Sequence, residues 1–222
     1  MKAKGIAQLG TVLILLFAHN NSHAALVSDL LITEVMPDPV AVSDSNGEWF
    51  ELFNPTNEII DLDGIILRDD GSNEYHFDGP LPISPGAYFV LGRNADLLSN
   101  GGFIANHVYN NFSLGNSGDE IVFSNGLIDL LRLDYGNSFD APGQSRELIS
   151  LPMTAASYHL TRASLSYGLG DIGTPGRAGT FNPSLSAVPL PPTAWLFLSG
   201  LLVVLFGDLR SMTRIAFTKF QA

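Results

Sequence analysis

The residues that could take part in catalysis or metal binding are few and scattered. The central part of the chain has three histidines, His76, His107 and His159, and none has a second histidine or a carboxylate at the spacing that places two metal ligands on one helix face. The serines lack a Gly-x-Ser-x-Gly elbow, and the sequence has no phosphate-binding glycine loop. The chain has no cysteine, which excludes disulfides and thiolate chemistry. We therefore predict no catalytic residue, no cofactor and no metal ion, and we expect that the protein is not an enzyme.

The spacing of the glutamates also argues against paired acid and base catalysis. Glu48 and Glu51 lie three residues apart, and side chains at that separation on a strand point to opposite faces of a sheet. They therefore cannot form the carboxylate pair that such chemistry requires. Asp119, which follows Gly118, is expected to cap a turn, and Asn54 is expected to do the same at the end of its strand.

Three pairs of aspartates could offer oxygen ligands to calcium: Asp38 with Asp44, Asp61 with Asp63, and Asp69 with Asp70. Calcium prefers such ligands, but the chain has no twelve-residue calcium-binding loop. We interpret these carboxylates as solvated surface groups. A calcium-dependent adhesion or extracellular-matrix role is kept as an alternative function.

The charge balance is strongly acidic. The 222 residues carry 22 acidic and 11 basic side chains, a net charge of -11. Residues 25–187 have six arginines, no lysine and 21 acidic residues, a net charge of -15. Nucleic-acid binding rests on lysine and arginine side chains that displace counterions, so no nucleic-acid partner is expected.

The N-terminal residues have the composition of a secretory signal peptide. Two lysines precede an uncharged run from Leu9 to Ala18, and Ala24 ends the segment with a small side chain. An apolar run of about ten residues is too short to span a bilayer, which needs about 20. We predict that residues 1–24 are a signal peptide, that signal peptidase cleaves after Ala24, and that the protein is exported.

The C-terminal end has a second tripartite pattern. A proline-rich linker over residues 181–192 contains Val188-Pro189-Leu190-Pro191, an apolar segment covers residues 193–209, and a basic tail covers residues 210–222. As a helix, the uncharged part of the apolar segment from Thr193 to Phe206 would rise about 20 Å against a hydrocarbon core of about 30 Å, which is marginal for a permanent anchor. Basic residues after such a segment favour a cytoplasmic tail. We expect membrane anchoring through this segment, with the bulk of the chain outside.

This pattern resembles the PEP-CTERM class of exosortase sorting signals, in its variant with Val-Pro-Leu-Pro. The match comprises Val188-Pro189-Leu190-Pro191, the run from Trp195 to Leu201 and the basic end. Pro192 departs from the small residue that is usual at its position. The resemblance implies an exosortase-type processing enzyme as a partner and a location at the cell surface or outside the cell after processing. A simple C-terminal membrane tail is the alternative.

The middle of the chain is expected to fold almost entirely as β-structure. It lacks the sustained 3.6-residue spacing of a long amphipathic helix, whereas short apolar or alternating runs recur between turn signals. Seven such strands predict a sandwich of two antiparallel sheets. The expected strands are Leu30–Met36, Glu48–Phe53, Ile59–Leu62, Ile65–Arg68, Tyr88–Leu91, Glu120–Phe123 and Leu127–Leu133, with one helical turn at residues 96–100.

Three local patterns carry more specific information about this sandwich. Asn125-Gly126 can adopt the two positive φ values of a type I′ turn, which predicts a hairpin. The strand that contains Trp49 and Phe50 supplies so much apolar area that it should be central. Ile60 and Leu62 alternate with aspartates, so that strand should have one buried and one solvated face.

The order of these elements resembles the lamin-tail domain, an immunoglobulin-like β-sandwich, over residues 28–180. The resemblance is carried by the opening strand Leu31–Pro37, the motif Glu48–Pro55 and the closing turn Gly173–Gly176. The residues that match family motifs, all expected to be structural, are Glu34, Glu48, Trp49, Glu51, Asn54, Gly64, Pro85, Gly86, Gly118, Asp119, Pro175 and Gly176. A tryptophan that often precedes the closing Pro-Gly is missing, and Tyr158 or Tyr167 could replace it.

These features predict a non-enzymatic, exported bacterial lamin-tail protein that is an exosortase substrate and acts as a binding or presentation module. The family resemblance names no ligand. The cell envelope and extracellular polysaccharide are candidate partners. Besides the calcium-dependent role, an accessory module of an exported hydrolase system is a further alternative.

Overall fold

The computed structural model describes residues 25–162 and 164–179. Within these ranges the chain forms twelve β-strands and four short helices. The predicted signal peptide (1–24), linker and sorting motif (181–192), apolar segment (193–209) and basic tail (210–222) lie outside the described residues. No helix within the described ranges is long and apolar enough to cross a membrane.

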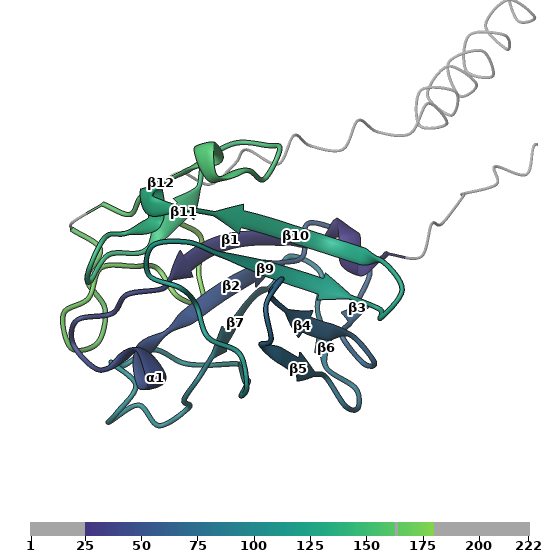
Figure 1. Ribbon diagram of the computed structural model, residues 1–222, viewed down its shortest axis with the longest axis horizontal. Coiled ribbons are helices and arrows are strands. Elements are labelled where there is room, and N and C mark those ends of the chain that lie inside the picture. Colours follow the sequence, from purple (N-terminus) through teal and green to yellow (C-terminus); the bar gives the residue numbers. More distant parts are fainter. Residues whose placement is uncertain (1–24, 163, 180–222) are drawn as a thin grey trace, which may run out of the picture. The chain divides into compact units, whose positions relative to one another are not determined.

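The strands belong to three sheets (Figure 1). In spatial order, the six-stranded sheet contains β12 (Tyr158–Leu160), β11 (Arg146–Leu148), β1 (Leu31–Met36), β2 (Trp49–Phe53), β7 (Tyr88–Gly92) and β8 (His107–Val108). The four-stranded sheet contains β10 (Asp129–Tyr135), β9 (Asp119–Ser124), β4 (Ile66–Arg68) and β5 (Glu74–His76). The third sheet pairs β3 (Ile60–Asp61) with β6 (Pro82–Ile83). The helices are α1 (Asp44–Gly47) and the 3-10 helices η1 (Val27–Asp29), η2 (Asn137–Phe139) and η3 (Ala155–Ser157).

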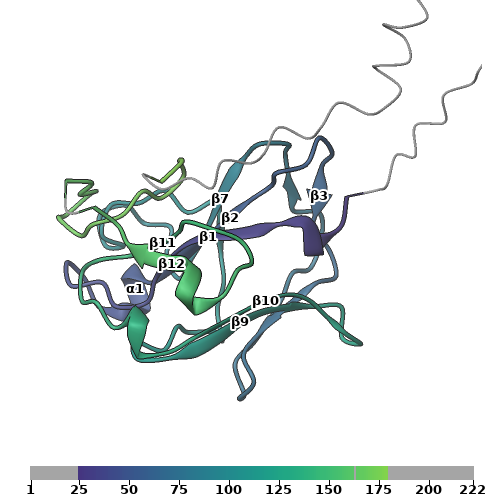
Figure 2. The same cartoon turned by 90° about the horizontal axis from the view of Figure 1, so that it is seen from above.

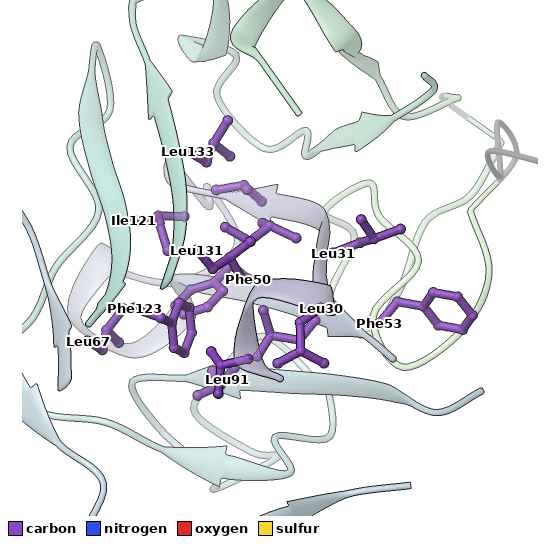
Figure 3. Close-up of a cluster of buried hydrophobic side chains, with 14 of the residues drawn as sticks. Leu30, Leu31, Phe50, Phe53, Leu67, Leu91, Ile121, Phe123, Leu131 and Leu133 are labelled. Atoms are coloured by element: carbon purple, nitrogen blue, oxygen red, sulfur yellow. The ribbon is translucent and has the colours of Figure 1, made fainter. Parts of the chain in front are cut away.

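The two larger sheets form the layers of a β-sandwich. Figure 2 shows β9 and β10 in one layer and β1, β2 and β7 in the other. Phe50 and Leu91 from one sheet and Leu67 and Phe123 from the other are completely buried in a shared core (Figure 3). The fold is therefore mostly β with two facing, mostly antiparallel sheets, which is consistent with the immunoglobulin-like sandwich that the resemblance implies.

β2 lies inside the six-stranded sheet, between β1 and β7, which confirms that the apolar strand is central. All of its residues are buried. Phe50 belongs to the main core, whereas Trp49 packs in a second apolar cluster with Met36, Val90 and Phe103. Because this second cluster lies on the other face of β2, the outer face of the sheet must also be covered by polypeptide.

The alternation predicted for the β3 region is confirmed. Ile60 and Leu62 are buried, whereas Asp61 and Asp63 are exposed. The strand is shorter than expected, because β3 comprises only Ile60–Asp61.

The β9–β10 hairpin is confirmed, but its predicted type I′ turn is wrong. The connection comprises residues 125–128, and of these only Gly126 has a positive φ, of 83°. The Asn125 Oδ1 accepts the backbone amides of Leu127 and Ile128, both at 3.0 Å. This side-chain bond stabilises a wider turn in place of the two-residue one.

Two further expectations about secondary structure need correction. The sheets are not purely antiparallel, since β8 pairs with β7 in parallel after the long crossover of residues 93–106. The strands β5, β6, β8, β11 and β12 were not predicted, because runs of two or three residues are too short to show periodicity. The helical turn expected at residues 96–100 is confirmed, because the Asn100 amide donates to the Asp96 carbonyl at 2.8 Å, which is the i to i+4 bond of one helical turn.

Candidate functional site

Three glutamates form a row across the outer face of the six-stranded sheet. Glu34 of β1 lies opposite Glu147 of β11 on one side and opposite Glu51 of β2 on the other. Each is only 1% exposed. Directly opposed side chains on neighbouring strands have Cβ atoms about 4.5–5.5 Å apart, so three acidic groups share one covered strip.

The carboxylate of Glu34 accepts hydrogen bonds from two separate parts of the chain. The Ser145 hydroxyl donates to Oε1 at 2.5 Å, and the Thr174 amide donates to the same oxygen at 2.8 Å. The Thr174 hydroxyl donates to Oε2. Glu34 therefore fastens the closing Gly-Thr-Pro-Gly turn to the sheet.

Glu51 fastens the next part of the same turn. Its Oε1 accepts the Thr33 hydroxyl at 2.7 Å, and its Oε2 accepts the Gly176 amide at 2.7 Å. The segment of residues 173–179, called the closing segment below, is thus held by buried carboxyl groups of two adjacent strands. The family-motif residues Glu34, Glu51, Pro175 and Gly176, far apart in sequence, meet at this one place.

Burial dominates the electrostatics of the row. Loss of hydration raises the pKa of Glu34 from its ordinary value of 4.5 to about 7, although hydrogen bonds from Ser145 and Thr174 oppose the shift. Burial raises the pKa of Glu51 to about 8, and the neighbouring Glu34 adds to that increase. No basic side chain among the described residues neutralises either group. Near neutral pH, Glu34 and Glu51 therefore avoid a buried negative charge by binding a proton.

Glu48 lies apart from this row, as its spacing from Glu51 predicted. Its Oε2 accepts the Leu114 amide at 3.0 Å and faces the Arg93 guanidinium at 3.3 Å. Burial raises the pKa of Glu48 to about 7, against the lowering effects of these two partners. The carboxylate joins α1 to the loop before β9, and it does not converge with Glu51.

The turn-capping predictions are confirmed. Asn54 Oδ1 accepts the Thr56 amide at 3.0 Å, and Asp119 Oδ2 accepts the Gly115 amide at 2.7 Å. Gly64, Gly86 and Gly118 have φ values of 74°, 69° and 151°, conformations that favour glycine. Pro85 precedes Gly86 in the turn closed by the bond from the Ala87 amide to the Ser84 carbonyl. These family-motif residues shape loops away from the glutamate row.

Tyr167 packs against Trp49 at the edge of the closing segment. The Trp49 Nε1 donates to the Tyr167 hydroxyl at 2.8 Å, and their rings meet edge-on with centroids 5.9 Å apart. Of the two tyrosines considered from the sequence, Tyr167 thus lies on the outer face. Tyr158 instead belongs to the main core, where its hydroxyl donates to the Ile32 carbonyl at 2.6 Å.

An open groove of about 480 Å³ lies beside the closing segment. It is formed by the start of β7, the loop before β8 and the segment of residues 166–177. Its lining residues are Tyr88, Gly102, Phe103, Ile104, Asn106, Ser166, Tyr167, Pro175, Gly176 and Arg177. The groove falls within the size range of small-ligand sites and is the candidate binding site of the domain.

The three histidines are not brought together, whereas the predicted pair Asp38 and Asp44 is: burial and the nearby charge of Asp44 raise the pKa of Asp38. His76, His107 and His159 lie on β5, β8 and β12, in two different sheets. Asp61 accepts the amides of Asp63 and Leu81. Asp69 likewise accepts amides of its own turn, and Asp70 pairs with two arginines. Across residues 25–162 and 164–179, no group of three or more acidic or histidine side chains is arranged to hold a metal ion.

Sequence reasoning missed several residues that line the groove or that hold the closing segment on the sheet. Glu147 lies on a strand too short to predict, and Thr174 and Arg177 belong to a loop whose docking depends on tertiary contacts. The one available hint was Glu34, a charged residue inside the apolar run Leu31–Met36. A carboxylate at such a position usually needs buried partners.

These features define a β-sandwich domain in which the closing segment lies on the outer face of one sheet and is bound there by buried glutamates. The sequence model of the Lamin Tail Domain family matches residues 23–136. That match covers more than half of the chain, so the chain belongs to the lamin tail domain family. β11, β12 and the closing segment follow the matched region. No curated protein and no solved structure matches the chain.

Proposed function

We propose that this lamin tail domain is an exported, non-enzymatic binding or presentation module. In this proposal the N-terminal signal peptide directs export, and the C-terminal segment holds the protein in the membrane. An exosortase-type enzyme then processes it near Val188-Pro189-Leu190-Pro191, so that the domain reaches the cell surface or the medium. Family membership supports the module, and the two end segments of the sequence support its route.

The observation that carries the binding role is the groove beside the closing segment. Its floor is fixed before any ligand arrives, because Glu51 holds the Gly176 amide and Tyr167 holds the Trp49 indole. A preformed concave surface loses less conformational entropy on binding than a mobile loop does. The groove is therefore better suited to recognition than the outer side of the four-stranded sheet, where Arg68 and Arg132 are already paired with aspartates.

The route is tested in the native host by determining the mature C terminus and the location of the protein. Mass spectrometry should find that the chain ends near Pro191 in the wild type. Alanine substitution of Val188 to Pro191 should leave the tail attached and the protein in the membrane fraction. Alanine substitution of the preceding linker residues 184–187 is the matched control and should not affect processing. An intact C terminus in the inner membrane of the wild type would overturn the processing claim.

A further inference from the structure

The groove has a charge opposite to that of the domain around it. Of its ten lining residues, Arg177 is the one charged residue. Residues 25–187 carry 21 acidic side chains, yet none of these lines the groove. The groove is thus a local site of positive charge on an acidic protein.

Arg177 is also available to a ligand. It is exposed, and within residues 25–162 and 164–179 its guanidinium makes no ion pair, hydrogen bond or ring contact. The other arginines with assigned contacts have partners. Arg68 and Arg132 form ion pairs with aspartates, and Arg93 forms one with Glu48. The guanidinium of Arg146 lies 6.0 Å from the centroid of the Phe139 ring. An exposed and unpaired guanidinium is well suited to bind a carboxylate through two parallel hydrogen bonds.

The backbone that carries Arg177 is fixed from below. The preceding Gly176 amide donates to Glu51, and the Arg177 amide closes a turn with the Thr174 carbonyl at 3.2 Å. Thr174 is itself bound to Glu34. The buried glutamates therefore fix the backbone from which the Arg177 side chain extends, although they do not line the groove.

The remaining walls combine apolar and hydrogen-bonding groups. Phe103 forms a buried wall, and Ile104 beside it is 72% exposed. Asn106 uses its Oδ1 to accept the Val90 amide, which leaves its side-chain nitrogen as a donor. Ser166 adds an exposed hydroxyl.

We propose that the groove binds the carboxy-terminal end of a partner polypeptide. The terminal carboxylate pairs with Arg177, an apolar last side chain packs against Phe103 and Ile104, and Asn106 and Ser166 bind the preceding peptide groups. A net charge of -15 over residues 25–187 and a single cation in the groove favour a ligand with one negative charge over a polyanion. The exposed isoleucine favours an apolar side chain over a sugar. This inference rests on the proposed binding role and specifies its ligand.

The test uses the full chain in a mild detergent and a rhodamine-labelled Ala-Ala-Leu-Phe peptide, followed by fluorescence anisotropy. The peptide with a free carboxylate should bind at least about tenfold more tightly than its carboxamide, because a charged hydrogen-bonded pair is lost in the amide. Arg177→Gln should abolish this difference without lowering the melting temperature. Arg162→Gln, which changes an exposed arginine outside the groove, should retain it.

Three outcomes would overturn the inference. They are equal binding of the acid and the amide, discrimination that survives Arg177→Gln, and absence of peptide binding at millimolar concentration. If an oligouronate binds more tightly than the peptide and competes with it, the ligand is a polysaccharide. In that case the polypeptide assignment fails while the binding role stands, and the processing experiment above remains independent of both.

Discussion

Glu34 and Glu51 lie directly opposite each other on β1 and β2, and their carboxyl groups bind the backbone amides of Thr174 and Gly176 in the closing segment. Two buried acids at this separation oppose each other's ionisation. The closing segment is therefore held by groups whose protonation depends on pH in the neutral range, and this dependence can be measured.

Stability toward urea is expected to fall as the pH rises from 4.5 toward about 8. The pKa values of Glu34 and Glu51 are raised to about 7 and about 8, above the ordinary value of 4.5, so the folded state retains protons that the unfolded chain releases. This stabilisation is complete below the ordinary pKa and is lost as the pH passes the folded-state values. Urea midpoints on either side of this window test it. Glu34→Gln with Glu51→Gln should reduce the slope of the profile and leave the smaller contribution of Glu48, whose pKa burial also raises to about 7. Midpoints that rise with pH would contradict the argument.

Removal of the Glu34 carboxyl group should strongly destabilise the domain. Glu34→Ala leaves the amide and the hydroxyl of Thr174 buried without their acceptor, and each such group costs about 1–3 kcal/mol. Glu34→Gln retains an acceptor oxygen and should cost much less. The free energy of unfolding from urea denaturation measures both. Glu58→Ala, at an exposed glutamate, is the control and should have almost no effect.

Two tyrosine-to-phenylalanine changes should differ in their effect on stability, because only one of the two hydroxyls takes part in a hydrogen bond. Tyr167→Phe removes the acceptor of the Trp49 indole and should cost about 1–3 kcal/mol, with a shift in tryptophan fluorescence. Tyr109→Phe removes a buried hydroxyl that has no hydrogen-bond partner among residues 25–162 and 164–179, so it should be neutral or stabilising. Thermal and urea unfolding of the two variants give the comparison. Equal destabilisation would show that volume, not hydrogen bonding, decides both.

Gly168 should tolerate alanine far less well than Gly64. Both have positive φ values, of 45° and 74°, so the backbone penalty of about 1–2 kcal/mol is shared. A Cβ at Gly168 would lie 1.9 Å from the Gly101 carbonyl oxygen, whereas a Cβ at Gly64 meets nothing within 4 Å. Gly168→Ala should therefore also separate the loops that line the groove. Similar melting temperatures for the two variants would refute this close packing.

Calcium should not stabilise the domain more than magnesium does. The carboxylate of Asp61 accepts backbone amides, and that of Asp70 pairs with Arg68 and Arg132. These internal bonds compete with a metal ion for the same oxygens. Melting curves at millimolar concentrations of either ion test the expectation. A shift with calcium alone would revive the calcium-dependent role.

The sequence by itself predicted the mostly β character, the central position of β2, the β9–β10 hairpin and the turn caps at Asn54 and Asp119. These features depend on local signals, such as apolar density, a two-residue alternation and side chains that bond neighbouring amides. The resemblance carried by Glu48–Pro55 also led to the correct family.

Only the tertiary structure showed what the buried acids of β1 and β2 do. A carboxylate in an apolar strand is visible in the sequence, but its partners lie more than a hundred residues away in the chain: the Glu34–Thr174 bond spans 140 residues and the Glu51–Gly176 bond spans 125. Strand register decides that Glu34, Glu51 and Glu147 share one row, and register is set by the packing of whole faces rather than by any short motif. The groove at Arg177 depends on the same contacts, so its position could not be predicted before the closing segment was placed on the sheet.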